Sequence, residues 1–277
     1  WSNGKTMVKE WLSQLLSYDR NVTRSPKSYN SQIGVPLSVW LLNESSQIGL
    51  IEAGISKVGE MQALHDIILP TVGVLTSLGA AHQENFSSLE EKCNEKLLLF
   101  KGTQALVYQL DDKIAAKCIT AAHYDGQLLA WSEHDTTAAF YVNSIEKHET
   151  TSTINYIWQQ TTQGSYTLPF IDDASISDSI TCAVVALHFG VQPDVLAQRM
   201  AVLEPVAMRL EVKEGQHGCT LINDSYNSDI NSLDIALDFM NRRPDHNGQQ
   251  RTLVLSDILQ SGLPDEELYR EVSYLAE

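Results

Sequence analysis

Residues 2–6, with the sequence Ser-Asn-Gly-Lys-Thr, constrain the fold of this chain more than any other stretch. They match the last positions of the phosphate-binding pattern G-x-x-x-x-G-K-[ST], whose first glycine would precede Trp1. In that pattern backbone N–H groups surround phosphate oxygens, the lysine reaches the outer phosphates and the hydroxyl binds Mg²⁺. Apolar residues recur at helical spacing over 7–16, which predicts a helix that opens at Thr6 and directs its partial positive charge at the loop. A solvated turn before a helix is the alternative for this stretch alone.

Composition limits the class of partner. The chain has 277 residues and a formal net charge of −16, which argues against a nucleic-acid or anionic-membrane surface but not against one local phosphate site. No apolar run approaches the roughly 20 residues that span a bilayer, so we expect no membrane insertion. Four widely spaced cysteines without a C-x-x-C pair predict free thiols in a reducing cytoplasm (Cys93, Cys118, Cys182 and Cys219).

The first two hundred residues alternate between helical and strand patterns. This order predicts a doubly wound parallel α/β sheet, with strands at 48–51, 71–76 and 105–108, helices at 6–16, 37–42 and 88–100, and a loop over 21–36. Short β-branched and aromatic segments between 128 and 170 predict an antiparallel β insertion of two or three hairpins. A helix over 177–189, capped by Gly190, and a second one opening at Pro193 follow.

A second unit begins near Pro205. Two strands around a turn, a helix and a further strand predict the start of a Rossmann-like α/β domain (209–212, 219–222, 232–240 and 252–255). Because a complete domain of this kind needs more strands, we expect a central nucleotide-binding domain over 1–204 and an incomplete domain over 205–277.

Two further residues are candidates for the phosphate site. Glu52 directly follows strand 48–51, and open sheets bind ligands at the carboxyl ends of their strands. Alone it would be a surface acid; with Lys5 and Thr6 it becomes a reasonable ligand for a nucleotide-bound Mg²⁺. Lys96 stands in helix 88–100, whose start has the Ser88–Glu91 pattern of a capping box. By itself it reads as an exposed lysine on an amphipathic helix.

In their order these motifs resemble the Mur ligase family, the ATP-dependent enzymes that add amino acids to the peptidoglycan precursor. The resemblance covers nearly the whole chain. The I-G-V-P and D-S-Y-N forms look most like members that join D-alanyl-D-alanine to UDP-N-acetylmuramoyl-tripeptide. Residues 255–262 look like versions of such an enzyme fused to a downstream alanine racemase. The motifs are residues 2–6, Asn30 with 33–36, Glu52 with Gly54, 76–82, Lys96 fourteen residues after His82, Arg209, and 224–227.

The resemblance also implies roles. Asn3, Gly4, Lys5 and Thr6 would bind the phosphates of ATP, and Thr6 with Glu52 would hold the first Mg²⁺. His82 would help to order a second Mg²⁺, for which CO₂ converts Lys96 into a carbamate ligand. The remaining expected ATP contacts are Asn30, Asp178 near the adenine, Arg209 on phosphate, Asp224 on ribose, and Tyr226 beside them.

The sequence departs from the family at several of these places. Asp178 stands where the family usually has asparagine, and a carboxylate can accept a hydrogen bond from an exocyclic amine but cannot donate one. Trp1 stands where glycine is usual, and Asp229-Ile230 replaces the usual Asn-Pro or His-Pro. These departures bear on the contacts to the base more than on those to phosphate and metal.

The implied activity is amide ligation through an acyl phosphate, with Lys5, Glu52, His82 and Lys96 as the catalytic set. Two alternatives stay open. A folate polyglutamate ligase shares the fold but usually reads Gly-Lys-Gly in its loop, whereas this chain reads Gly-Lys-Thr. The other is a nucleotide-binding module without ligase activity. Because the family grips the UDP group with a further N-terminal domain, we expect residues 1–277 alone to turn over little.

Overall fold

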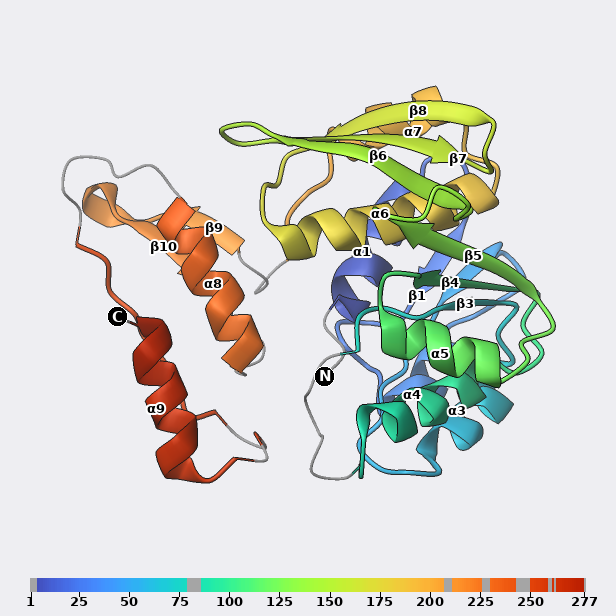
Figure 1. The fold of residues 1–277 in the computed structure, drawn as a ribbon, viewed down its shortest axis with the longest axis horizontal. Coiled ribbons are helices and arrows are strands. Elements are labelled where there is room, and N and C mark those ends of the chain that lie inside the picture. The colour runs from blue at the N-terminus through green and yellow to red at the C-terminus, as the bar shows by residue number, and fades with distance from the viewer. Residues whose placement is uncertain are drawn as a thin grey trace. The chain divides into compact units, whose positions relative to one another are not determined.

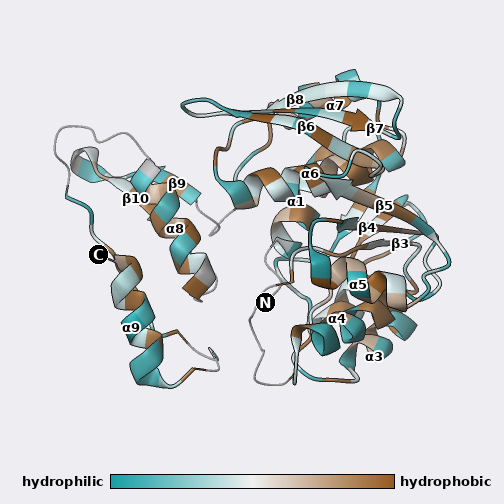
Figure 2. Ribbon diagram, viewed as in Figure 1, coloured by the Kyte–Doolittle hydropathy of each residue, from teal (hydrophilic) through white to brown (hydrophobic). Residues whose placement is uncertain are grey.

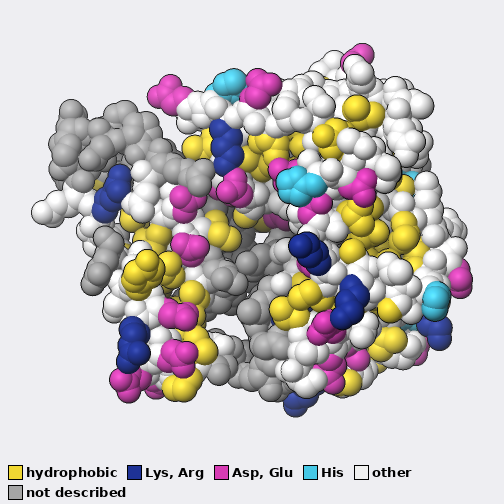
Figure 3. All heavy atoms as spheres, in the orientation of Figure 1, with side chains coloured by type: hydrophobic (Ala, Val, Ile, Leu, Met, Phe, Trp, Pro, Cys, Tyr) yellow, Lys and Arg dark blue, Asp and Glu magenta, His cyan; other side chains and the backbone are white. Residues whose placement is uncertain are grey.

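The computed structural model describes residues 4–78, 86–206, 211–225, 230–242, 250–258, 261 and 263–276. The chain divides into two compact units (Figure 1), the first holding the described residues up to Leu203 and the second those from Glu204 onward. None of the described helices is long and apolar enough to cross a bilayer. On the face drawn in Figure 3, lysine and arginine side chains stand singly among aspartates and glutamates.

The first unit is built on a six-stranded sheet in the order β3-β4-β5-β6-β7-β8. The pairings from β3 to β6 are parallel, and those from β6 to β8 are antiparallel. A separate parallel pair is formed by β1 (Val22–Arg24) and β2 (Ile48–Leu50). The strands of the larger sheet are β3 (Val72–Val74), β4 (Ala105–Gln109), β5 (Gln127–Ser132), β6 (Phe140–Lys147), β7 (Ser152–Trp158) and β8 (Thr162–Leu168).

Helices cover both faces of the sheet, as the doubly wound prediction requires (Figure 1). On one face α1 (Lys5–Leu16) packs against α6 (Asp173–His188), and α6 contacts β4 and β5. The other face is covered by α3 (Glu60–Ile68), α4 (Leu89–Leu97) with the 3₁₀ turn η2 (Leu98–Phe100), and α5 (Lys113–Ala121). Figure 2 shows hydrophilic residues on the outer surfaces of α4 and α5. The sheet core therefore lies between two helical layers, which is the arrangement of an α/β domain.

Local sequence explains where the helices begin. Helix α4 starts after Ser88, whose hydroxyl accepts from the Glu91 N–H at 3.0 Å. The Glu91 carboxylate accepts from the N–H of Ser87 rather than of Ser88, at 2.6 Å, so the predicted capping box is shifted by one residue on its return side. Helix α2 (Gly34–Val39) begins three residues before the predicted 37–42, because Pro36 fits within a first helical turn.

The predicted loop over 21–36 was wrong in part, since it contains β1 and the start of α2. Helix α5 had no counterpart in the predicted pattern; Asp112 caps it by accepting from the N–H groups of Ile114 and Ala115. Helix α6 begins after Asp172, four residues before the predicted 177, and α7 (Pro193–Met200) opens at Pro193 as expected.

The predicted antiparallel segment is present and continues the main sheet. Strand β5 belongs to the parallel part, and β6, β7 and β8 extend it as two hairpins. The β5–β6 pairing joins only Trp131 to Phe140 and Ser132 to Tyr141. Because β6 starts beside the end of β5, the parallel pairing needs no long crossover.

In the second unit β9 (Glu211–Glu214) and β10 (Thr220–Asn223) pair antiparallel, and α8 (Ile230–Arg242) packs against α9 (Asp265–Ala276). The predicted strand 252–255 was wrong: residues 250–258 form no strand, and the Val254 side chain is 91% exposed. A strand needs a hydrogen-bonding neighbour, and no described residue of this unit pairs with that segment. The described residues of the second unit contain no parallel pair of strands, so the Rossmann-like topology of this domain stays a prediction.

Leu106 and Leu128 test the position of the core. They are paired across β4 and β5, yet Leu106 is fully buried whereas Leu128 is 42% exposed. We expect Leu106→Ala to lower the free energy of unfolding by about 3 kcal/mol and Leu128→Ala by less than about 1 kcal/mol. Urea denaturation measures both, and equal losses would contradict the burial described here.

Candidate functional site

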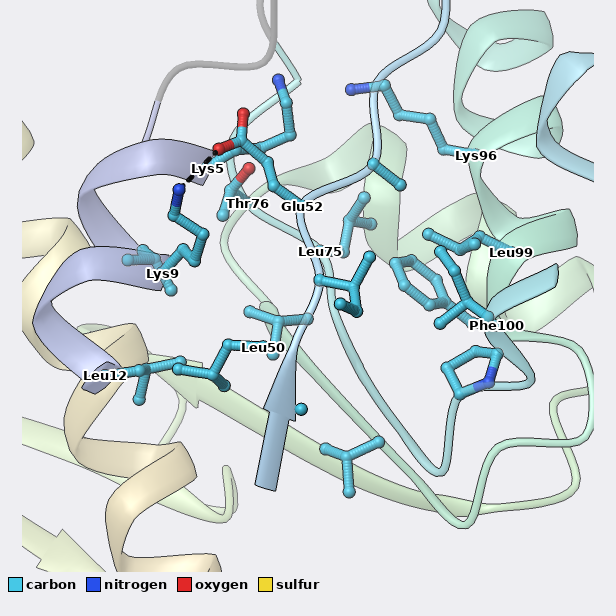
Figure 4. Close-up of a pocket in the computed structure, with 18 of the residues that line it drawn as sticks. Lys5, Lys9, Leu12, Leu50, Glu52, Leu75, Thr76, Lys96, Leu99 and Phe100 are labelled. Carbon is cyan, nitrogen blue, oxygen red and sulfur yellow. Dashed lines mark ion pairs between the residues drawn. The ribbon is translucent and has the colours of Figure 1, made fainter. Parts of the chain in front are cut away.

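A pocket of about 160 Å³ opens where β2 and β3 end, beside the first turn of α1 (Figure 4). Polar side chains gather at one end of it, and the rest of its wall is apolar. The carboxyl ends of parallel strands beside a helix N-terminus are a usual ligand position in α/β proteins. The polar lining residues are Lys5, Lys9, Glu52, Thr76 and Lys96, and the apolar ones include Leu12, Leu50, Val74, Leu99 and Phe100.

The start of α1 borders this pocket through Lys5, which directly follows Gly4. Gly4 has φ +90°, in the left-handed region that disfavours side chains. A Cβ atom at this position would lie 2.1 Å from the Asp178 carboxylate oxygen Oδ1. Only glycine satisfies both restraints, so the loop keeps its backbone close to Asp178 on α6.

Glu52 is the acidic residue of the pocket and is 5% exposed. The Thr6 hydroxyl donates to its two carboxylate oxygens at 3.0 and 3.2 Å, and Asn30 Nδ2 donates to Oε1 at 2.7 Å. The ammonium of Lys9 lies 3.7 Å from Oε2. A buried carboxylate needs such compensation, and a carboxylate beside a threonine hydroxyl offers the oxygen ligands that Mg²⁺ prefers.

Asn30 is itself held by the turn after β2. The Gly54 N–H donates to the Asn30 carbonyl at 2.8 Å, and a Cβ atom on Gly54 would lie 3.2 Å from the Asn30 side chain. The close approach explains why glycine follows the acid by two residues. The motif that joins Asn30, Glu52 and Gly54 in the sequence is therefore one hydrogen-bonded unit in space.

Lys96 is buried, with only 7% of its surface exposed. The interpretation of this residue by itself as an exposed lysine was therefore wrong. Burial lowers its pKa well below the usual value, and the neighbouring cations Lys5 and Lys92 lower it further. Within the described residues no hydrogen-bond acceptor or anion pairs with its amino group. Lys92, one turn earlier, is also buried, and burial lowers its pKa too. A deprotonated amine in this position is a nucleophile.

The structure brings most of the candidate residues together. Lys5, Glu52 and Lys96 line the same pocket, and their polar groups point toward one end of it (Figure 4). Thr6 and Asn30 contact Glu52, while Gly4 and Asp178 adjoin the start of α1. Asp224 follows β10 in the second unit. Four candidates lie outside the described residues: Asn3, His82, Arg209 and Tyr226.

Sequence reasoning missed Lys9 and Lys92, which are 5% and 2% exposed. A signal for Lys9 existed: it lies on the helical stripe formed by Lys5, Leu12 and Leu16, where an apolar side chain is expected. A lysine at a buried helical position usually has a specific partner.

The donor set suits a shared magnesium ion. Among the described residues no three His, Cys, Asp or Glu side chains form a group that could hold a metal alone. Mg²⁺ usually takes one or two protein oxygens and fills its octahedron with water and substrate phosphates. The buried Glu52 carboxylate and the Thr6 hydroxyl beside it fit that mode of binding.

The low pKa of Lys96 predicts a pH dependence of stability. In CO₂-free buffer its pKa is lower in the folded chain than the usual 10.5, so the unfolded state binds more protons between the two values. The free energy of unfolding should rise with pH through that window. We expect Lys96→Met to flatten this rise and to stabilise the chain at pH 7 by on the order of 1 kcal/mol.

Urea denaturation at several pH values measures this slope. Lys117→Met is the control, because the Lys117 side chain is 72% exposed on α5 and should leave the slope unchanged. If the free energy of unfolding rose with pH equally steeply in Lys96→Met and in the unmodified chain, the burial and low pKa of the Lys96 amine would be contradicted.

Comparison with known proteins gives a consistent set of matches. The family model of the Mur ligase middle domain matches residues 2–186. The UDP-N-acetylmuramoyl-tripeptide–D-alanyl-D-alanine ligase of Bacillus subtilis is 26% identical over 281 residues, which cover 98% of this chain and 57% of that protein. The corresponding ligase of Escherichia coli is 24% identical over 276 residues, 99% of this chain and 60% of that protein.

Among solved structures, a crystal structure of MurF from Acinetobacter baumannii has a TM-score of 0.78 at 22% identity, covering 88% of this chain and 53% of its own. MurF ligase from Thermotoga maritima in complex with ADP has a TM-score of 0.75 at 23% identity, covering 88% and 56%. These structures share the fold. The chain spans 57–60% of the length of the two curated relatives.

Proposed function

We propose a function for this protein on the basis of its family: the chain belongs to the Mur ligase family, whose middle-domain model matches residues 2–186. The full-length protein is an ATP-dependent ligase that joins D-alanyl-D-alanine to UDP-N-acetylmuramoyl-tripeptide. Relatives that align with 98–99% of the chain carry that name. The observation that carries the proposal is the pocket at which the start of α1, Glu52 and Lys96 meet.

In this proposal the triphosphate of ATP lies at the start of α1. The first backbone N–H groups and the Lys5 ammonium face the phosphate oxygens, where a helix N-terminus favours negative charge. Thr6 and Glu52 would hold Mg²⁺, which would neutralise charge on the phosphates. Such compensation matters because the reaction brings a carboxylate substrate against an anionic phosphoryl group.

After reaction with CO₂, Lys96 would supply a ligand for the second Mg²⁺. Its neutral amine nitrogen forms a bond to the carbon of CO₂ and releases one proton, which leaves a carbamate anion on the side chain. The low pKa of Lys96 favours this addition, and the adjacent Lys5 and Lys92 provide positive charge for the product. The carbamate and His82 would hold the second Mg²⁺, which would add positive charge beside the phosphates.

The ligation has two steps. A carboxylate oxygen of the tripeptide attacks the γ-phosphorus, the bond to ADP breaks, and an acyl phosphate forms. The amine of D-alanyl-D-alanine then attacks the acyl carbon, loses a proton, and inorganic phosphate leaves. The chain aligns the reactants and excludes water that would hydrolyse the acyl phosphate. Arg209, Asp224 and Tyr226 stay proposed as further contacts to ATP.

The Thr6 contact favours this function over a folate polyglutamate ligase. A loop that reads Gly-Lys-Gly has no hydroxyl at this position, whereas here the hydroxyl bonds to both oxygens of Glu52.

We also propose that residues 255–262 belong to a version of the ligase that is fused to a downstream alanine racemase. The sequence of the native polypeptide beyond Glu277 tests this proposal.

Phosphate release tests the reaction. With ATP, Mg²⁺ and UDP-N-acetylmuramoyl-tripeptide, the full-length protein should release phosphate at least about tenfold faster when D-alanyl-D-alanine is added. Release that ignores the dipeptide would indicate an ATPase, and absence of nucleotide binding would indicate a module without ligase activity. Glutamate addition to a folate substrate would favour the polyglutamate ligase.

Replacement of Lys96 tests its proposed role. Lys96→Ala should reduce ligation at least about 100-fold, because the second metal loses a ligand. Acetate or another small carboxylate should restore part of the rate, since it can occupy the space of the carbamate. Lys117→Ala, at an exposed position on α5, is the control and should retain full activity. Unchanged ligation in Lys96→Ala would remove the metal role.

A further inference from the structure

Lys9 is a buried cation in the pocket to which the family resemblance gives no role. We propose that Lys9 is a positioning residue for the Mg²⁺·ATP site: it fixes the Glu52 carboxylate while leaving oxygen Oε2 available to the metal. This inference rests on the proposed function, because it concerns how the acid that would hold Mg²⁺ is kept in place. Figure 4 shows Lys9 reaching from the second turn of α1 toward Glu52.

Backbone groups fix the ammonium of Lys9. It donates to the carbonyl of Ser25 at 2.9 Å and to the carbonyl of Lys27, and it lies 3.0 Å from Glu10 Oε1. Three partners match the three N–H bonds of an ammonium group. The charge therefore has a set position relative to the main chain.

In that position the Lys9 ammonium compensates the charge of Glu52 without forming a hydrogen bond to its carboxylate. The distance of 3.7 Å from Lys9 Nζ to Glu52 Oε2 is too long for a hydrogen bond, but a buried pair at this separation attracts strongly. Asn30 donates to Oε1. Among the described residues, Oε2 accepts a hydrogen bond only from the Thr6 hydroxyl, and Thr6 is the residue expected to share the cation.

Lys9 also connects α1 to the segment that carries Asn30. Its contacts to Ser25 and Lys27 hold the chain after β1 against the helix, and the Ser25 hydroxyl in turn accepts from the Glu52 N–H at 3.0 Å. One side chain thus restrains both the carboxylate and its hydrogen-bonding neighbours. Removing it leaves a 5%-exposed carboxylate without the Lys9 cation that pairs with it, a change that is costly in buried pairs.

Binding of ATP with and without Mg²⁺ tests the inference in the full-length protein by isothermal titration calorimetry. Lys9→Met should raise the Kd of ATP at least about tenfold in Mg²⁺ and less than about twofold in EDTA. Lys9→Arg, which keeps charge and donors, should recover most of the Mg²⁺-dependent affinity. Glu10→Gln is the matched control: it removes the other ion pair of Lys9, and we expect less than about a twofold change in either buffer.

Thermal unfolding separates positioning from folding, and Lys9→Gln replaces Lys9→Met if the latter is unfolded at the assay temperature. Equal losses of affinity with and without Mg²⁺, or a Lys9 variant that binds Mg²⁺·ATP like Glu10→Gln, would overturn the positioning role alone. If the unmodified protein binds ATP no better with Mg²⁺ than without it, the proposed function is rejected together with this inference.

Discussion

Charge compensation in a buried place is the interaction on which the candidate site depends. Glu52 lies two residues after β2 in the first unit, and its charge is balanced by a hydroxyl and an ammonium from α1 and by an amide from the chain after β1. Each of those segments is fixed in turn by the strand or helix that carries it. The packing of α1 against the β1–β2 pair is therefore also what assembles the acid and the start of the phosphate loop.

The sequence was informative where chemistry and local pattern coincide. A strand that ends in an acid, and a Gly-Lys-Thr that opens an apolar helix, predicted positions that the structure places beside one pocket. The alternation of strands and helices predicted the doubly wound sheet. These signals are local, because a strand period and a helix start depend on residues within a few positions of one another.

Burial could not be predicted in the same way. Lys96 has leucines after it and acids before it, a pattern shared by many surface helices. It is a buried amine only because the fold places it in a pocket with residues of α1 and β3. The segment 252–255 failed for the opposite reason: its apolar side chains suit a strand, but no described neighbour pairs with it. Both outcomes are set by residues distant in sequence, as tertiary context overrides local preference.

The cap of α4 has a consequence for the geometry of Lys96. Ser88 ends the non-helical chain and fixes which residue is the first of the helix. Each residue advances a helix by about 100° of rotation, so a slip of a single position would carry Lys96 about a quarter-turn round the helix axis and away from the cavity. The Ser88 hydroxyl, about two turns away, thus determines which side of α4 carries the Lys96 amine and whether that amine faces the pocket.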